Sequence, residues 1–223
     1  WDTERFSFIT GTAPDTVNPS LWRQGVLNNF SGLFKVTEGI WQMRGYDLAN
    51  MTLVAGKTGW IVIDPLLTAE RAKATFDFAN KTLGERPIVA VIYTHSHIDH
   101  FGGVRGIVSD EDITSGRVKI IAPAGFMENA VAENVLAGNV MSRRASYQFG
   151  TQLPSSKKQS VGTGLGKALS TGSVGLIPPT DIITKTGEEL SVDGIRIVFQ
   201  MANGSEAPAE FAFYFPDYNA LCL

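Results

Sequence analysis

The sequence is poor in cysteine, in long apolar runs and in any excess of one charge. Its 223 residues include a single cysteine, Cys222, which cannot form a disulfide within the chain. No apolar run approaches the roughly 20 residues that span a bilayer, so we expect a soluble domain that is not transmembrane. The 19 Lys and Arg residues against 22 Asp and Glu give a formal net charge of −3, which argues against a nucleic-acid partner.

Histidine is also scarce, and its distribution is the most informative feature of the sequence. The chain has three histidines, and His95, His97 and His100 lie close together with Asp99 among them. Imidazole and carboxylate groups are ligands that zinc-like cations select. Because alternate residues of an extended loop point the same way, we expect His95 and His97 to share one ion. Asp99 and His100 would then face a second ion about 3.5–4 Å away.

A surface histidine tract and a structural zinc site both fit this cluster less well. A tag-like or surface histidine tract is typically terminal and homogeneous, whereas this one contains Asp99 and follows the apolar run 87–94. A single structural zinc site usually employs thiolates, and Cys222 lies far away in the sequence. The pattern therefore favours a catalytic metal site at the carboxyl end of a buried strand.

Apolar runs and helical periodicity predict strands and helices that alternate along the chain. We predict strands at 51–55, 59–65, 87–94 and 118–122, and helices at 69–83 and 126–137 that end at Gly84 and Gly138. The residues before about 50 contain scattered proline and glycine. They predict an irregular lead-in with short strands, not a helix.

Beyond residue 150 the pattern changes. Residues 150–180 are rich in Ser, Gly, Thr and Lys and predict a long connection without regular structure. Short apolar runs then predict an antiparallel group of strands at 182–184, 189–192, 195–199 and 211–215. Residues 218–223 predict the start of another strand, so we expect a fragment of a longer protein. Any targeting segment would lie upstream, and the compartment stays open, with a periplasmic or secreted location included.

The run from Thr94 to Gly103 resembles the HxHxDH signature of the metallo-β-lactamase fold. This resemblance implies an α/β (α+β) fold, a four-layer αββα sandwich incomplete at its C-terminus, with a binuclear zinc site at the edge between its two sheets. It also implies a lead-in over residues 1–50 and a truncated catalytic domain over residues 51–223. The signature does not identify the substrate, because hydrolases of several classes carry it.

Other stretches resemble one branch of that fold, the zinc-dependent linear and secondary alkylsulfatases. They are residues 21–24, 32–36, 44–52, 133–139, 141–144 and 204–211. The resemblance implies that His95 and His97 bind one Zn²⁺ ion with Glu206 as its third ligand, and that Asp99 and His100 bind the other. It also implies that a bridging carboxylate, a last zinc histidine and a leaving-group acid lie beyond residue 223.

The residues alone leave two alternatives for Glu206. It lies in the turn 205–208 after a predicted strand, where its carboxylate either reaches a metal or is solvated. Glu210 is a rival ligand, although it enters an apolar run and fits an edge charge better. A carboxylate in place of a histidine would partly offset the charge of the ion and weaken its Lewis acidity.

For the intact protein, the resemblance implies zinc-dependent hydrolysis of alkyl sulfate esters, such as dodecyl sulfate-type surfactants, to an alcohol and inorganic sulfate. A hydroxide that bridges two zinc ions would attack, and Asp99 would orient it by accepting a hydrogen bond. The resemblance also implies a homodimer, and we expect the fragment alone to be inactive. The alternatives are another binuclear-zinc hydrolase of the same fold, acting on thioesters or phosphodiesters, and a non-catalytic metal-binding fragment.

Four further residues are candidates on weaker grounds. Asp64 ends a predicted strand and resembles a residue that supports the metal ligands in this fold, although an aspartate is also typical of a strand end. Arg143, Arg144 and Tyr147 follow a predicted helix and are candidate substrate-binding residues, because guanidinium groups match sulfate through paired hydrogen bonds. A surface role is the common alternative for arginines.

Overall fold

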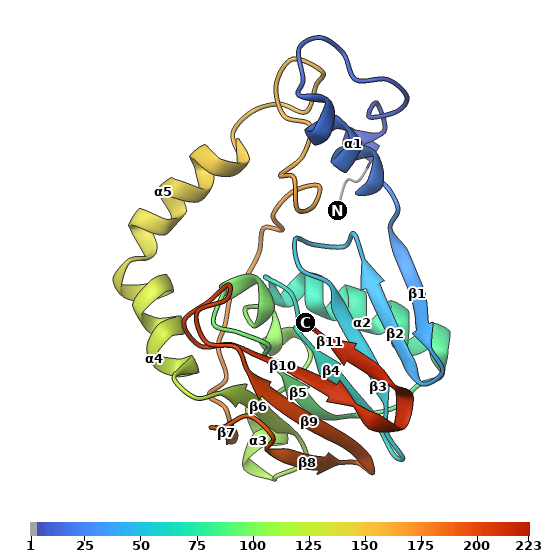
Figure 1. The fold of residues 1–223 in the computed structure, drawn as a ribbon, viewed down its shortest axis with the longest axis vertical. Coiled ribbons are helices and arrows are strands. Elements are labelled where there is room, and N and C mark those ends of the chain that lie inside the picture. The colour runs from blue at the N-terminus through green and yellow to red at the C-terminus, as the bar shows by residue number, and fades with distance from the viewer. Residues whose placement is uncertain (1–3) are drawn as a thin grey trace.

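The computed structural model describes residues 4–223 and contains two β-sheets that stack face to face (Figure 1). In spatial order, the first sheet contains β1 (Gly32–Thr37), β2 (Ile40–Arg44), β3 (Met51–Ala55), β4 (Trp60–Ile63), β5 (Ile88–Ile92), β6 (Lys119–Pro123) and β7 (Asp181–Ile183). The second contains β11 (Ala220–Cys222), β10 (Phe211–Phe215), β9 (Ile195–Met201) and β8 (Glu189–Val192). The first sheet is antiparallel up to β4 and parallel from β4 to β7, whereas the second is wholly antiparallel.

Helices precede β1 and occupy some of the connections between the strands. The α-helices are α1 (Pro19–Leu27), α2 (Ala69–Leu83), α3 (Asp110–Thr114), α4 (Phe126–Val131) and α5 (Gly138–Phe149). The 3-10 helices are η1 (Glu4–Phe6), η2 (Ile98–His100), η3 (Val104–Gly106) and η5 (Pro216–Tyr218), and η4 (Ala132–Leu136) is a π-helical turn. Within residues 4–223, no helix combines the length and the apolar character needed to cross a membrane.

Apolar side chains from both sheets fill the space between them. β4 is buried on both of its faces, as its continuous apolar sequence predicts. Ile61 and Ile63 face the second sheet, in one cluster with Phe211 and Phe213 of β10. Val62 points the opposite way, because successive side chains of a strand alternate between its faces. The centre of the first sheet therefore packs against the second sheet.

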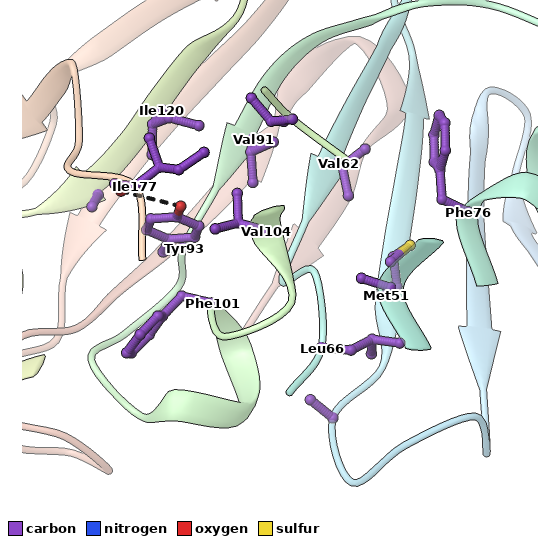
Figure 2. Packing of buried hydrophobic residues seen from close by; sticks show 14 of the residues in the cluster. Met51, Val62, Leu66, Phe76, Val91, Tyr93, Phe101, Val104, Ile120 and Ile177 are labelled. Carbon is purple, nitrogen blue, oxygen red and sulfur yellow. Dashed lines mark hydrogen bonds between the residues drawn. The ribbon is translucent and has the colours of Figure 1, made fainter. Parts of the chain in front are cut away.

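The other face of the first sheet packs against the helices. Figure 2 shows Val91 and Tyr93 beside Val104 of η3, in a cluster that also contains Phe76 of α2. The Tyr93 hydroxyl donates a hydrogen bond to the carbonyl of Ile177, 3.3 Å away, and so ties the 150–180 connection to this layer. These contacts pack the segment that follows β5 against the helical layer.

The expected α/β fold class is confirmed, with three of the four expected layers among the described residues. The second sheet lies in front in Figure 1, and no helix of residues 4–223 crosses its outer face there. The predicted strands 51–55 and 59–65 form the antiparallel pair β3 and β4. The predicted helix 69–83 is α2 with the same bounds, and Gly84 (φ 102°) follows it. Residues 150–180 lack helices and strands, as predicted.

The prediction that the lead-in contains no helix was wrong. α1 forms over Pro19–Leu27 because the Asn18 side chain accepts a hydrogen bond from the Ser20 amide and Pro19 occupies the first helical position. Trp22 of this helix is buried, and it packs against residues of the 150–180 connection. Isolated proline and glycine residues indicated an irregular segment, whereas a proline at a helix start favours the helix.

The prediction that Gly138 ends a helix was also wrong. The helical segment that starts at Phe126 ends with the π-helical turn at Leu136, Ala137 interrupts it with a non-helical backbone (φ −97°, ψ 5°), and Gly138 begins α5, which runs to Phe149. A glycine ends a helix when it takes a left-handed conformation, and here Gly150 does so (φ 59°).

The strand near residue 182 does not join the antiparallel group that we predicted. β7 pairs in parallel with β6 in the first sheet, with Ile121 opposite Asp181. The long 150–180 connection carries the chain back to the start of a neighbouring strand, as a parallel pair requires.

Asp193 links the two sheets at the end away from the histidine loop. It lies in the turn between β8 and β9, and its side chain accepts hydrogen bonds from the amides of Thr58 and Gly59 and from the Thr58 hydroxyl. Its carbonyl accepts from the Lys57 amide. A turn of the second sheet therefore caps the β3–β4 hairpin of the first.

We expect Asp193→Asn to reduce the dependence of stability on pH. Burial tends to raise the pKa of Asp193, but hydrogen bonds from Thr58 and Gly59 outweigh it and lower the pKa. Its contribution is thus present above the usual aspartate pKa and is lost as pH falls through the lowered value. Urea unfolding from about pH 5 downward should show a steeper loss for wild type than for the variant. Asp15→Asn is the exposed control, and parallel curves for wild type and Asp193→Asn would contradict the expectation.

Candidate metal centre

The histidine loop lies where two parallel strands end side by side. β4 and β5 pair in parallel with Ile63 opposite Ile92, so their carboxyl ends meet at one edge of the first sheet. Asp64 follows β4 directly, and Thr94 and His95 follow β5, with all three residues buried. The predicted position of the cluster at the carboxyl end of a buried strand is confirmed.

The carboxylate of Asp64 connects these two strand ends. Its backbone takes a left-handed conformation (φ 55°), which is uncommon for a residue other than glycine. Oδ1 accepts a hydrogen bond from the Thr94 amide at 2.9 Å, and Oδ2 accepts one from the Thr94 hydroxyl at 2.8 Å. Oδ2 also lies 2.7 Å from Nδ1 of His100. Asp64 therefore orients the histidine loop and does more than end a strand.

The same hydrogen bonds decide which ring nitrogens face the cluster. The Thr94 hydroxyl has one hydrogen, which it donates to Asp64, so it accepts from Nδ1 of His95, 2.9 Å away. His100 likewise donates from Nδ1 to Asp64. A proton on Nδ1 leaves Nε2 of each neutral ring with a free lone pair, which is the form that binds a metal.

His95, His97 and Glu206 bring one donor atom each into a single group. Nε2 of His95 lies 3.1 Å from Nδ1 of His97, and Nδ1 of His97 lies 3.7 Å from Oε1 of Glu206. All three donor atoms lie within 4.8 Å of one another. Two imidazoles and a carboxylate are a donor set that zinc and similar ions accept, so these residues fit a metal ion.

Asp99 and His100 lie beside this group and supply two more donors. The His100 ring lies 3.9 Å from the His95 ring, measured between centroids. Nε2 of His100 lies 3.4 Å from Oδ2 of Asp99. The structure thus brings the four residues of the histidine loop together, and it adds Glu206 from the second sheet.

Burial and neighbouring charges set the protonation of these groups. Burial lowers the pKa of His95, and the charge on His100 lowers it further, so that ring is neutral at pH 7. Burial also tends to lower the pKa of His100, but the Asp64 and Asp99 carboxylates outweigh it and raise that pKa well above its usual range. Burial tends to raise the pKa of Asp99, and its hydrogen bond with His100 outweighs this and lowers the pKa. A cation that binds His100 therefore displaces a proton.

Glu210 has a role that sequence reasoning missed. Its Oε2 accepts hydrogen bonds from the Ser205 hydroxyl and from the amides of Glu206 and Ala207. Glu210 also forms a β-bridge with His95, which attaches this turn to the histidine loop. The rival ligand thus braces the turn that carries Glu206. A carboxylate that accepts hydrogen bonds from nearby backbone amides is typical of a turn, but the sequence does not reveal the β-bridge to His95.

The proposed substrate residues lie elsewhere on the molecule. Arg143, Arg144 and Tyr147 belong to α5, which extends away from the two sheets in Figure 1, and their side chains are exposed. Within residues 4–223, no hydrogen bond or ion pair joins them to the histidine loop. They lie within a helix and not after one, and their role in substrate binding stays a prediction.

Comparisons with known proteins extend the resemblance to the whole chain. The sequence pattern of the metallo-beta-lactamase superfamily matches residues 44–212. A linear primary-alkylsulfatase from Pseudomonas sp. is 56% identical over 223 residues, which cover 99% of this chain and 33% of that protein. An alkyl/aryl-sulfatase from Saccharomyces cerevisiae is 50% identical over 222 residues, which cover 99% of this chain and 34% of that protein.

A solved structure is similar over the same extent. The structure of a stereoselective inverting sec-alkylsulfatase from Pseudomonas sp. superposes with a TM-score of 0.96 at 47% identity, covering 99% of this chain and 35% of that one. The resemblance inferred from short stretches of sequence is thereby confirmed. The chain spans about a third of the length of the curated relatives that it matches.

We expect Thr94→Val to weaken metal binding about 10–100-fold. Valine matches threonine in shape but removes the hydroxyl that links Asp64 to His95, so the His95 ring loses the acceptor for its Nδ1 hydrogen. Affinity for cobalt, followed by its visible absorption, measures the effect. Thr82→Val on the exposed side of α2 is the control, and wild-type affinity in Thr94→Val would show that the link does not matter.

Proposed function

The chain belongs to the metallo-β-lactamase superfamily, and we propose that it forms part of the catalytic domain of an alkylsulfatase. The proposed reaction is the hydrolysis of an alkyl sulfate ester to an alcohol and inorganic sulfate. The observation that carries this proposal is identity of 50–56% to named sulfatases over 99% of the chain. The fold alone supports many hydrolytic reactions and does not select among them.

Two zinc ions are the proposed cofactors. His95, His97 and Glu206 would hold one, because their donor atoms already form one group. Asp99 and His100 would contribute two ligands to the second. Bound zinc supplies Lewis acidity, which makes water an effective nucleophile at neutral pH.

The residues of the chain prepare this site in three ways. Asp64 holds His100, and through Thr94 also His95, in the tautomers that leave Nε2 free for ligation. Asp99 is the proposed hydrogen-bond acceptor for the water that attacks the ester, and its lowered pKa keeps it an anion at neutral pH. The low pKa of His95 keeps that ring neutral, as a ligand must be.

Other parts of the expectation have less support. Arg143, Arg144 and Tyr147 of α5 remain candidate contacts for the sulfate-bearing substrate, since a guanidinium group matches sulfate through paired hydrogen bonds. The homodimer and the absence of a nucleic-acid partner also remain predictions.

Removal of metal should abolish activity. We expect the full-length protein to release sulfate from dodecyl sulfate, to lose this activity when a chelator strips its metal, and to regain it with zinc. Ion chromatography measures sulfate, and elemental analysis should find two zinc ions per chain. Full activity after complete metal removal would contradict the proposal. Turnover of thioesters or phosphodiesters with inert alkyl sulfates would favour the other hydrolase class.

Glu206→Gln should lower both zinc content and kcat/KM. Loss of a direct ligand should cost more than the roughly 10–100-fold that loss of a ligand's supporting partner costs. Glu85→Gln, at an exposed position beyond α2, is the control. Zinc content and kcat/KM at the wild-type level in Glu206→Gln would remove Glu206 from the ligand set and reopen the case for Glu210.

A further inference from the structure

Glu133 lies on the π-helical turn Ala132–Leu136 and faces the histidine loop. Its Oε2 lies 3.9 Å from Nε2 of His97, and its side chain is 25% exposed. Val135 and Leu136 on the same turn are instead 71% and 81% exposed. Because burial normally favours apolar side chains over carboxylates, this turn has an inverted pattern of burial. Turns of π-helix within a helical segment are frequent at functional sites.

The orientation of His97 differs from that of the other two histidines. His95 and His100 direct Nδ1 toward an oxygen atom outside the donor group, and their Nε2 atoms lie beside His97 and Asp99. His97 instead directs Nδ1 into the donor group, 3.1 Å from His95 and 3.7 Å from Glu206. When His97 is neutral and Nδ1 is a ligand, Nε2 carries the hydrogen. That hydrogen needs an acceptor on the far side of the ring, and Glu133 lies there.

We propose that Glu133 is a positioning residue for His97, whose carboxylate accepts the Nε2 hydrogen and holds Nδ1 in the donor group. This inference rests on the proposed metal-dependent function. At 3.9 Å the two atoms are beyond hydrogen-bond distance, and a side-chain shift of about 1 Å or one bridging water completes the contact. Within residues 4–223, no other ion pair or side-chain hydrogen bond engages the Glu133 carboxylate, so it is available for this role.

With Glu133 included, each histidine of the loop has an oxygen atom behind it. Thr94 serves His95, Asp64 serves His100, and Glu133 serves His97. Such partners fix the tautomer and orientation of a ligating ring and raise its basicity. The first two belong to the sheet edge, whereas Glu133 comes from the helical segment between β6 and β7.

The test compares Glu133→Ala with Glu133→Gln in the full-length protein. Zinc affinity is measured by competition with a chromophoric chelator, and the site geometry by the visible absorption of the cobalt-substituted protein. We expect Glu133→Ala to weaken zinc binding about 10–100-fold and to change the cobalt spectrum. Glu133→Gln keeps a side-chain oxygen of the same reach, so it should restore affinity to within a few-fold of wild type.

Two controls separate positioning from a general effect on folding. Glu128→Ala changes an exposed carboxylate on α4 and should leave zinc affinity unchanged. The free energy of unfolding of zinc-free Glu133→Ala should equal that of the zinc-free wild type, because a partly exposed polar contact with 3.9 Å between its atoms contributes little to stability. A loss of stability in the zinc-free form that accounts for the weaker zinc binding would make the role structural and overturn the inference.

The remaining outcomes distinguish this inference from the proposed function. Wild-type zinc affinity in Glu133→Ala overturns the inference and leaves the function standing. A Glu133→Gln variant as weak as Glu133→Ala also overturns it, because the carboxylate would then act through its charge or as a direct ligand. Zinc binding without hydrolysis of alkyl sulfates removes the proposed substrate and keeps the role of Glu133. A wild-type protein that binds no metal overturns both.

Discussion

The carboxylate of Asp64 joins the ends of β4 and β5 through the Thr94 amide, the Thr94 hydroxyl and Nδ1 of His100. A buried carboxylate is costly unless it is hydrogen-bonded, and these contacts offset that cost. They also leave little freedom for the loop, since both oxygens are engaged and two histidine tautomers depend on them. The left-handed backbone of Asp64 is what turns its side chain toward the neighbouring strand.

The second sheet supplies the remaining contacts of the candidate site. β10 starts next to the histidine loop, where the Phe211 amide donates to the Thr94 carbonyl. Glu210 holds the preceding turn through three hydrogen bonds, and that turn carries Glu206 to within 3.7 Å of His97. Since apolar packing between the sheets sets their separation, the position of Glu206 depends on the core as well as on its own turn. A metal centre of this kind is therefore a property of the stacked sheets and not of the loop alone.

Local pattern predicted some elements well and others poorly, for identifiable reasons. β4 and β5 are continuous apolar runs and α2 has helical periodicity, and the bounds of these elements and of β3 agree with the prediction within a few residues. α1 was missed because Pro19 indicates a helix only together with the Asn18 cap and the burial of Trp22. Gly138 has the same sequence signature as a helix end, yet only its backbone conformation distinguishes it from Gly150. The partner of β7 depends on where a long connection returns, which no local pattern encodes.

For the candidate site, the sequence by itself determined the chemistry of the donors: three imidazoles and a carboxylate at close spacing after a buried strand, and hence the kind of ion they suit. Spacing along an extended loop is enough for this, because it is a local property. Only the tertiary structure decided that Glu206 joins His95 and His97 while Glu210 braces the turn. It alone decided which nitrogen of each ring faces inward, because Asp64 and Glu133 come from segments that only folding brings next to the histidine loop.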